Sequence, residues 1–70
     1  MNISELKAAM ARKNISIPQL AEQLNISKKT AYTRFSGETD FNLSEIRKIA
    51  DILELSYDDI RLIFFDDKVA

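Results

Sequence analysis

Cysteine, histidine and tryptophan are absent from this 70-residue chain, and glycine and proline occur once each. Without cysteine the chain forms no disulfide and no thiolate metal site, and without histidine it lacks the commonest zinc ligand and general base. No apolar run reaches the ~18 residues that a membrane-spanning helix needs, and no signal-peptide segment opens the chain. These absences favour a small cytoplasmic binding module without a cofactor over an enzyme.

The length of the chain leaves room for one domain, since domains commonly have ~100–150 residues. A chain this short buries only ~60% of the surface that it exposes when unfolded, so its core must be thin. We expect one domain over residues 1–65 and a flexible tail over residues 66–70, where nothing in the sequence ties the terminus down.

Charge is divided unevenly along the chain. Ten Lys and Arg against eleven Asp and Glu give a formal net charge of −1. Residues 1–36 carry six cations and two acids, whereas residues 37–70 carry four cations and nine acids. This asymmetry suggests one face suited to a polyanion and another that repels it, although charges scattered for solubility are an alternative.

Five helices are expected, each beginning after a residue that caps helix N-termini. The expected caps are Ser4, Ser16, Ser27, Asn42 and Ser56. The first four helices run to about residues 13, 24, 36 and 53, and the fifth ends before residue 65. Gln19 and Glu45 complete capping boxes three residues after their caps. No hairpin signal competes, so the sequence predicts an all-α fold.

Apolar residues recur at helical spacing in these segments and form the expected core. They are Leu6, Met10, Leu20, Leu24, Ile26, Ile46, Ile49 and Leu53. Asn14 and Gly37 suit the positions just after a helix, where the chain adopts a left-handed conformation.

Residues 16–37 are the most informative part of the chain, since they hold two short helices joined by Asn25-Ile26-Ser27. Asn25 tolerates the left-handed conformation that turns the chain sharply, Ile26 fills the gap between the helices, and Ser27 caps the second helix. Helices joined by so short a turn cross steeply, as in a helix-turn-helix.

The helix that begins at Lys28 separates its residues by face, at ~100° per residue. One arc of ~140° holds polar residues without any acid, and these are Lys28, Lys29, Tyr32, Thr33 and Ser36. Thr30, Ala31 and Arg34 fall on the opposite side. A helix that reads the major groove needs such donors, hydroxyls and a ring or methyl group to meet base edges.

The segment from Leu20 to Thr30, LAEQLNISKKT, resembles the helix-turn-helix of the phage-repressor/Cro-type DNA-binding family. The downstream FNLSEI at residues 41–46, followed by apolar residues up to Phe65, is similar to small phage and prophage regulators. The resemblance covers about residues 3–65 and implies a five-helix repressor-like domain in a bacterial host. It also implies a homodimer that reads a partly palindromic operator in double-stranded DNA with its third helix.

Carried over position by position, the resemblance implies two sets of DNA-binding residues. The base-edge candidates are Lys28, Lys29, Tyr32 and Thr33. The candidates for phosphate contact or for positioning the helix are Ser16, Gln19, Ser27, Thr30 and Ser36.

The sequence departs from the family pattern at three places. Asn25 stands where glycine is usual, and the loop from Glu38 to Asn42 is acidic. Arg34 stands where many members carry an apolar core residue. We expect Phe35 to turn into the core and Arg34 to be freed for a phosphate. The alternative is an internal pair of Arg34 with Glu38 or Glu22.

The apolar cluster Leu62, Ile63, Phe64 and Phe65 is a candidate dimer interface, because a small core has room for only some of these side chains. A core that absorbs all four is the alternative. The cluster and the acidic second half also suit a rival function, in which the domain docks on a partner phage repressor. Catalysis is not expected, since the sequence has no nucleophile–base pair and no phosphate-cradling glycine loop.

Overall fold

A computed structural model describes residues 1–65, and this part of the chain holds five α-helices and no β-strand. The helices are α1 (Ile3–Arg12), α2 (Ile17–Leu24), α3 (Lys28–Phe35), α4 (Leu43–Ile52) and α5 (Tyr57–Phe64). The predicted all-α class and the five helices are confirmed. The predicted tail, residues 66–70, lies outside the described residues.

Four of the five expected N-caps hold their helices as predicted. Ser16, Ser27, Asn42 and Ser56 each accept a hydrogen bond from the backbone N–H three residues ahead. The expectation that Ser4 caps the first helix is wrong, because the Oδ1 atom of Asn2 accepts the Glu5 N–H at 3.2 Å instead. The Asn2 N–H donates to the Ile63 carbonyl at 2.6 Å, which ties the start of α1 to α5 and moves the cap upstream.

Left-handed residues end three of the helical segments before α4, as the sequence predicts. Asn14, Asn25 and Gly37 have φ angles of 58°, 62° and 89°. Glu54 adopts a φ of 53° after α4, which its residue type does not predict. Its carboxylate pairs with Lys13 Nζ at 3.0 Å, but this exposed pair adds little stability.

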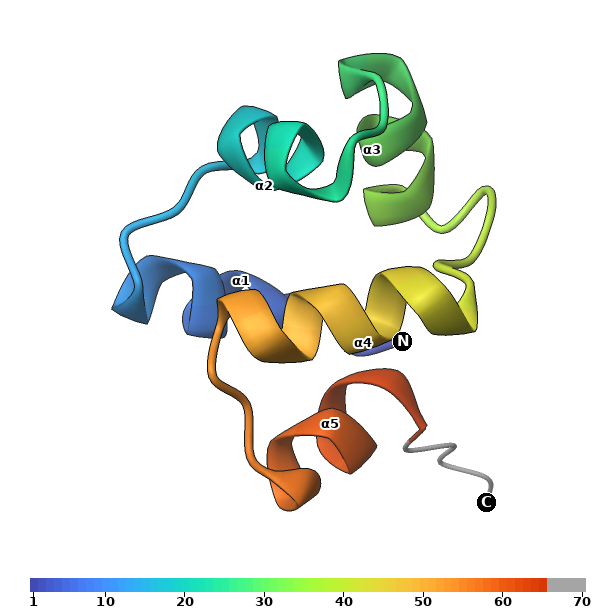
Figure 1. Cartoon of the computed structure of the whole chain (residues 1–70). Helices are drawn as coiled ribbons and strands as arrows, with labels where there is room; N and C mark the ends of the chain where they lie inside the picture. The colour runs from blue at the N-terminus through green and yellow to red at the C-terminus, as the bar shows by residue number, and fades with distance from the viewer. Residues whose placement is uncertain (66–70) are drawn as a thin grey trace.

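The helices are arranged so that α2 and α3 lie on one side of α1 and α4, and α5 lies on the other (Figure 1). Leu6, Leu20 and Ile49 are fully buried where these elements meet. Six of the eight predicted core residues are buried, and the other two, Ile26 and Ile46, are half-buried against the same core. The core therefore lies between the α2–α3 pair and the other helices, and α2 and α3 pack against it.

Phe35 turns into the core, as predicted, and begins a chain of aromatic contacts. Its ring meets Phe41 edge-on at a centroid distance of 5.7 Å, and Phe41 meets Phe64 in the same way at 6.2 Å. Edge-to-face pairs at such distances are favourable beyond the area that they bury. The end of α3 is thereby anchored to the following loop and to α5.

We predict that replacing Asn25 tests the left-handed turn between α2 and α3. Asn25→Ala lowers the free energy of unfolding by about 1 kcal/mol, because a Cβ without a polar side chain disfavours this conformation. Asn25→Gly changes it by only about 0.5 kcal/mol, since the relief of strain is offset by the entropy of the unfolded chain. Urea unfolding followed by circular dichroism measures both values.

Gln23→Ala is the control, because Gln23 is an exposed residue inside α2. It should change the free energy of unfolding by no more than about 0.5 kcal/mol. Equal stability of Asn25→Ala and Asn25→Gly would show that the turn carries no conformational constraint.

Candidate nucleic-acid interface

A short turn fixes α3 against α2. Asn25 donates its backbone N–H to the Glu22 carbonyl at 3.1 Å, and Ile26 donates to Ala21 at 3.0 Å, so the last turn of α2 is closed. The Ser27 hydroxyl then accepts the Thr30 N–H at 3.0 Å and starts α3. Each of the three turn residues therefore takes part in ending α2 or starting α3. Among the helices, α3 packs mainly on α2.

Burial separates the two faces of α3. Ala31 and Phe35 are buried, whereas Lys28, Lys29 and Ser36 are exposed. Tyr32 keeps 52% of its surface exposed. The outward face predicted from the sequence is therefore present.

Two threonines of α3 lie at the boundary between these faces. Thr33 is half-buried, although it was expected on the outward arc. Thr30 is also half-buried, although it was expected on the inward side.

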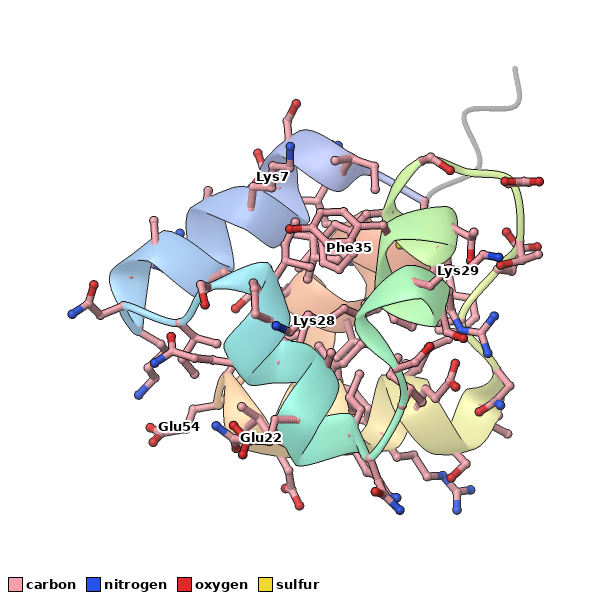
Figure 2. The ribbon with its side chains drawn as sticks, turned by 90° about the horizontal axis from the view of Figure 1, so that it is seen from above. Lys7, Glu22, Lys28, Lys29, Phe35 and Glu54 are labelled. Carbon is pink, nitrogen blue, oxygen red and sulfur yellow. The ribbon has the colours of Figure 1, made fainter. Side chains whose placement is uncertain are left out.

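The two lysines at the start of α3 point in different directions. Lys28 reaches toward α2, and Lys29 extends away from it on the other side of α3 (Figure 2). Neither lysine side chain forms an ion pair or a hydrogen bond within residues 1–65. Two cations at the positive end of a helix dipole are unfavourable for the helix, and an anionic ligand relieves that cost.

Gln19 at the start of α2 joins the same surface. Its Oε1 atom accepts the Ser16 N–H at 2.8 Å, and its own N–H donates to the Ser16 hydroxyl at 3.2 Å, which is the predicted capping box. The side-chain amide nitrogen has no partner in the described part of the chain and keeps two donors. Gln19 and Lys28 line one shallow hollow, so the structure brings these two candidates together.

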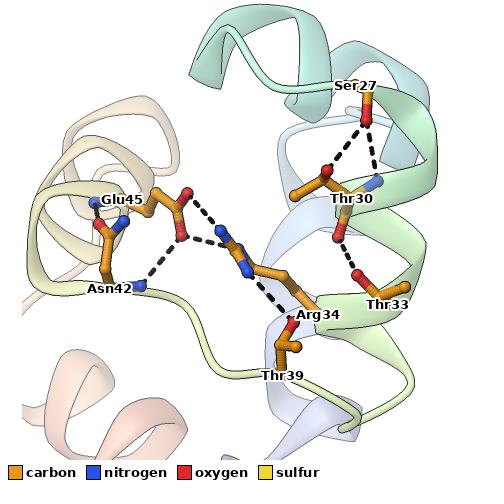
Figure 3. Close-up of polar contacts among 7 residues, drawn as sticks. All are labelled: Ser27, Thr30, Thr33, Arg34, Thr39, Asn42 and Glu45. Atoms are coloured by element: carbon orange, nitrogen blue, oxygen red, sulfur yellow. Dashed lines mark hydrogen bonds and ion pairs between the residues drawn. The ribbon is translucent and has the colours of Figure 1, made fainter.

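The serine and threonine hydroxyl groups along α3 and at its two ends form hydrogen bonds within the helix. Thr33 Oγ1 donates to the Thr30 carbonyl at 2.8 Å, and Ser36 Oγ donates to the Thr33 carbonyl at 2.9 Å. The Ser27 and Thr30 hydroxyls bond to each other at 3.0 Å (Figure 3). Thr33 and Ser36 thus donate their hydroxyl protons within the helix, and Ser36 Oγ also accepts the Glu38 N–H at 3.4 Å. Their remaining lone pairs suit base amino groups better than phosphate oxygens.

Arg34 is not free for a phosphate, so that expectation is wrong. Its Nη2 atom donates to Glu45 Oε2 at 3.0 Å, its Nη1 atom donates to Thr39 Oγ1 at 3.1 Å, and its Nε lies 2.8 Å from Glu45 Oε1 (Figure 3). The alternative of an internal pair is right in kind, but the partner is neither Glu38 nor Glu22. Arg34 sits on the side of α3 that faces the start of α4, where the capping box holds Glu45.

The apolar cluster at the end of α5 is divided between core and surface. Ile63 is buried with only 2% exposed, which contradicts its place in the predicted interface. Phe64 is half-buried against the core, while Leu62 and Phe65 are 38% and 56% exposed. Neighbouring residues on a helix differ by ~100°, so one turn cannot present all four side chains to one surface.

The turn, the steeply packed helix pair and the polar face of α3 define a helix-turn-helix domain. The model of the Cro/C1-type HTH DNA-binding domain matches residues 5–66, and the chain belongs to this family. The resemblance inferred from Leu20 to Thr30 is thereby confirmed, and the domain is of a DNA-binding type. Neither the curated proteins nor the solved structures contain a match to the chain.

Two further observations apply to residues 1–65. None of their helices combines the length and the apolar character that crossing a bilayer requires. Within the same range, no three Asp or Glu residues gather closely enough to hold a metal ion.

We predict that Ser27 contributes to stability through its cap. Ser27→Ala lowers the free energy of unfolding by about 1 kcal/mol, because the Thr30 N–H loses its acceptor. Ser27→Gly costs only about 0.3 kcal/mol, since water reaches the same N–H when no side chain is present. Thermal or urea unfolding separates the two, and Ser44→Ala is the control, because the Ser44 side chain is exposed and makes no hydrogen bond within residues 1–65. A Ser27→Ala variant as stable as the parent chain would contradict the capping role.

Proposed function

We propose that this DNA-binding domain is a sequence-specific transcriptional regulator of the Cro-like or prophage-repressor kind. It reads a partly palindromic operator as a homodimer, with α3 in the major groove. The observation that carries the proposal is the outward face of α3, where Lys28, Lys29 and Tyr32 are exposed and no acid interrupts them.

The dimensions of α3 suit this reading. An α-helix with its side chains has a diameter of about 10–12 Å, which fits the major groove, about 12 Å wide. Lysine side chains donate to guanine O6 and N7, and the Tyr32 ring meets a thymine methyl group. The free amide of Gln19 adds a donor beside the groove, where phosphate contacts set the register of the protein.

A homodimer follows from the small size of the reading surface. A few side chains on one short helix discriminate only a few base pairs, and two copies spaced by one turn of DNA, ~34 Å, double the contacts. Exposed Leu62 and Phe65 support self-association. The same surface also suits docking on a partner repressor, and the DNA-binding experiment separates that alternative.

We predict that the α3 lysines provide much of the operator affinity. An operator is first selected from random duplexes. Lys29→Ala and Lys28→Ala then each weaken binding by about 1–3 kcal/mol per half-site if the lysine contacts a base. If the lysine contacts a phosphate, the dimer loses one contact from each copy, and the slope of log K against log salt becomes less steep by about 1.8. Fluorescence anisotropy between about 50 and 200 mM salt measures both quantities.

Arg61→Ala is the matched control, because it removes one positive charge from α5, on the opposite side of the domain from α3 (Figure 1). It should leave operator affinity and salt slope unchanged. If the parent chain selects no duplex and a basic partner co-purifies with it, the operator-reading proposal is wrong. Docking on a partner repressor is then the function that the results favour.

A further inference from the structure

One ion pair in the described chain involves α3, and it joins the last turn of α3 to the first turn of α4. The other two ion pairs within residues 1–65 lie elsewhere: Lys13 with Glu54, and Arg61 with Asp58 inside α5. The Arg34 and Glu45 side chains are only 18% and 10% exposed. Their contact is therefore shielded from solvent, unlike the two surface pairs.

Glu45 is held in place by contacts other than that with Arg34. Its Oε1 atom accepts the Asn42 N–H at 3.0 Å, and its own N–H donates to Asn42 Oδ1 at 2.8 Å. The capping box thus fixes the carboxylate relative to the axis of α4. A group with so few remaining orientations can define the position of its partner.

Arg34 uses its planar fork to reach two elements at once. Nη2 meets Glu45 on α4, and Nη1 meets Thr39 in the loop that connects α3 to α4. The Nε–H is buried near Glu45 Oε1 without forming a hydrogen bond, so that contact is electrostatic. A lysine has a single ammonium group and cannot reproduce this arrangement.

The Arg34–Glu45 contact differs in kind from the other contacts that hold α3. α3 packs chiefly on α2, and the apolar edge-on contact of Phe35 with Phe41 anchors its end. The Arg34–Glu45 contact is directional, because it combines a charge pair with hydrogen bonds of defined geometry. Buried ionic contacts of this kind fix registry in some proteins, even where they add little net stability.

We propose that Arg34 and Glu45 are a positioning pair that sets the angle at which α3 presents its outward face to DNA. This inference rests on the proposed operator-reading function. Sequence discrimination then depends on two residues that do not touch DNA. The positive charge of Arg34 pairs with Glu45 inside the domain and does not contact a phosphate.

The test compares Arg34→Lys and Glu45→Gln with the parent chain. The measurements are the affinities for the selected operator and for a random duplex, and the salt slope of each. We expect both variants to lower the operator-to-random affinity ratio by about tenfold, because misalignment of one base contact costs that much. We expect the salt slope on the operator to stay unchanged.

Glu54→Gln is the matched control for Glu45→Gln, since it removes the same charge from an exposed ion pair. It should leave the affinity ratio unchanged. A direct phosphate contact by Arg34 predicts the reverse pattern. Glu45→Gln would then free Arg34 and raise both affinities beyond the control, and Arg34→Gln would make the salt slope less steep by about 1.8, one contact from each copy. That pattern overturns the proposal.

Circular dichroism at the assay temperature shows whether each variant is folded. If Arg34→Lys or Glu45→Gln unfolds, Thr39→Val decides, because it removes one hydrogen bond of Arg34 and keeps the ion pair. An affinity ratio lowered about threefold supports the proposal, and an unchanged ratio overturns it. In one further outcome, the parent chain selects an operator and Lys29→Ala weakens binding, while the operator-to-random affinity ratios of the Arg34, Glu45 and Thr39 variants stay unchanged. That result contradicts the positioning role and leaves the proposed operator-reading function in place.

Discussion

Two helices of eight residues each are too short to persist in water by themselves, and the reading unit of this domain consists of two such helices, α2 and α3. Their inward-facing residues Leu20, Leu24 and Phe35 are buried in a core that also contains Leu6 and Ile49. This burial is the constraint on which the rest depends. Because the inner faces provide the stability, the outer face of α3 is free to carry residues chosen for a ligand.

The electrostatics of the domain follow from which charges are engaged internally. Arg34 and Lys13 belong to the positive half of the chain, yet both are paired with carboxylates of the acidic half. The surplus of positive charge counted along the sequence is therefore larger than the surplus available to DNA. The lysines that begin α3 supply much of what remains near the reading surface, which concentrates the attraction at one place.

Much of the fold was predictable because its signals are local. Capping boxes at Ser16 and Asn42 and the left-handed Asn25 depend on residues three or four positions apart, which the sequence displays directly. The first cap could not be predicted in this way, because Asn2 is placed by a bond to Ile63 at the far end of the chain.

The candidate site was predictable to a similar degree. The polar outward face of α3 follows from helical periodicity, and exposure of Lys28, Lys29 and Tyr32 agrees with it. The role of Arg34 does not follow, since its partner Glu45 is eleven residues away and is brought near only by the packing of α3 and α4. The prediction of an interface at Leu62 to Phe65 is wrong for Ile63, which is buried. The rotation of α5 on the core decides which of these residues is buried, and the sequence does not give that rotation.

The central claim is that the outward face of α3 is the surface that meets the duplex. An NMR titration of the ¹⁵N-labelled chain with its selected duplex tests this most directly. We expect the largest amide shifts at Lys28, Lys29 and Tyr32, with Gln19 also affected and α5 nearly unchanged. Shifts confined to α5 around Leu62 and Phe65, with α3 unaffected, would contradict it.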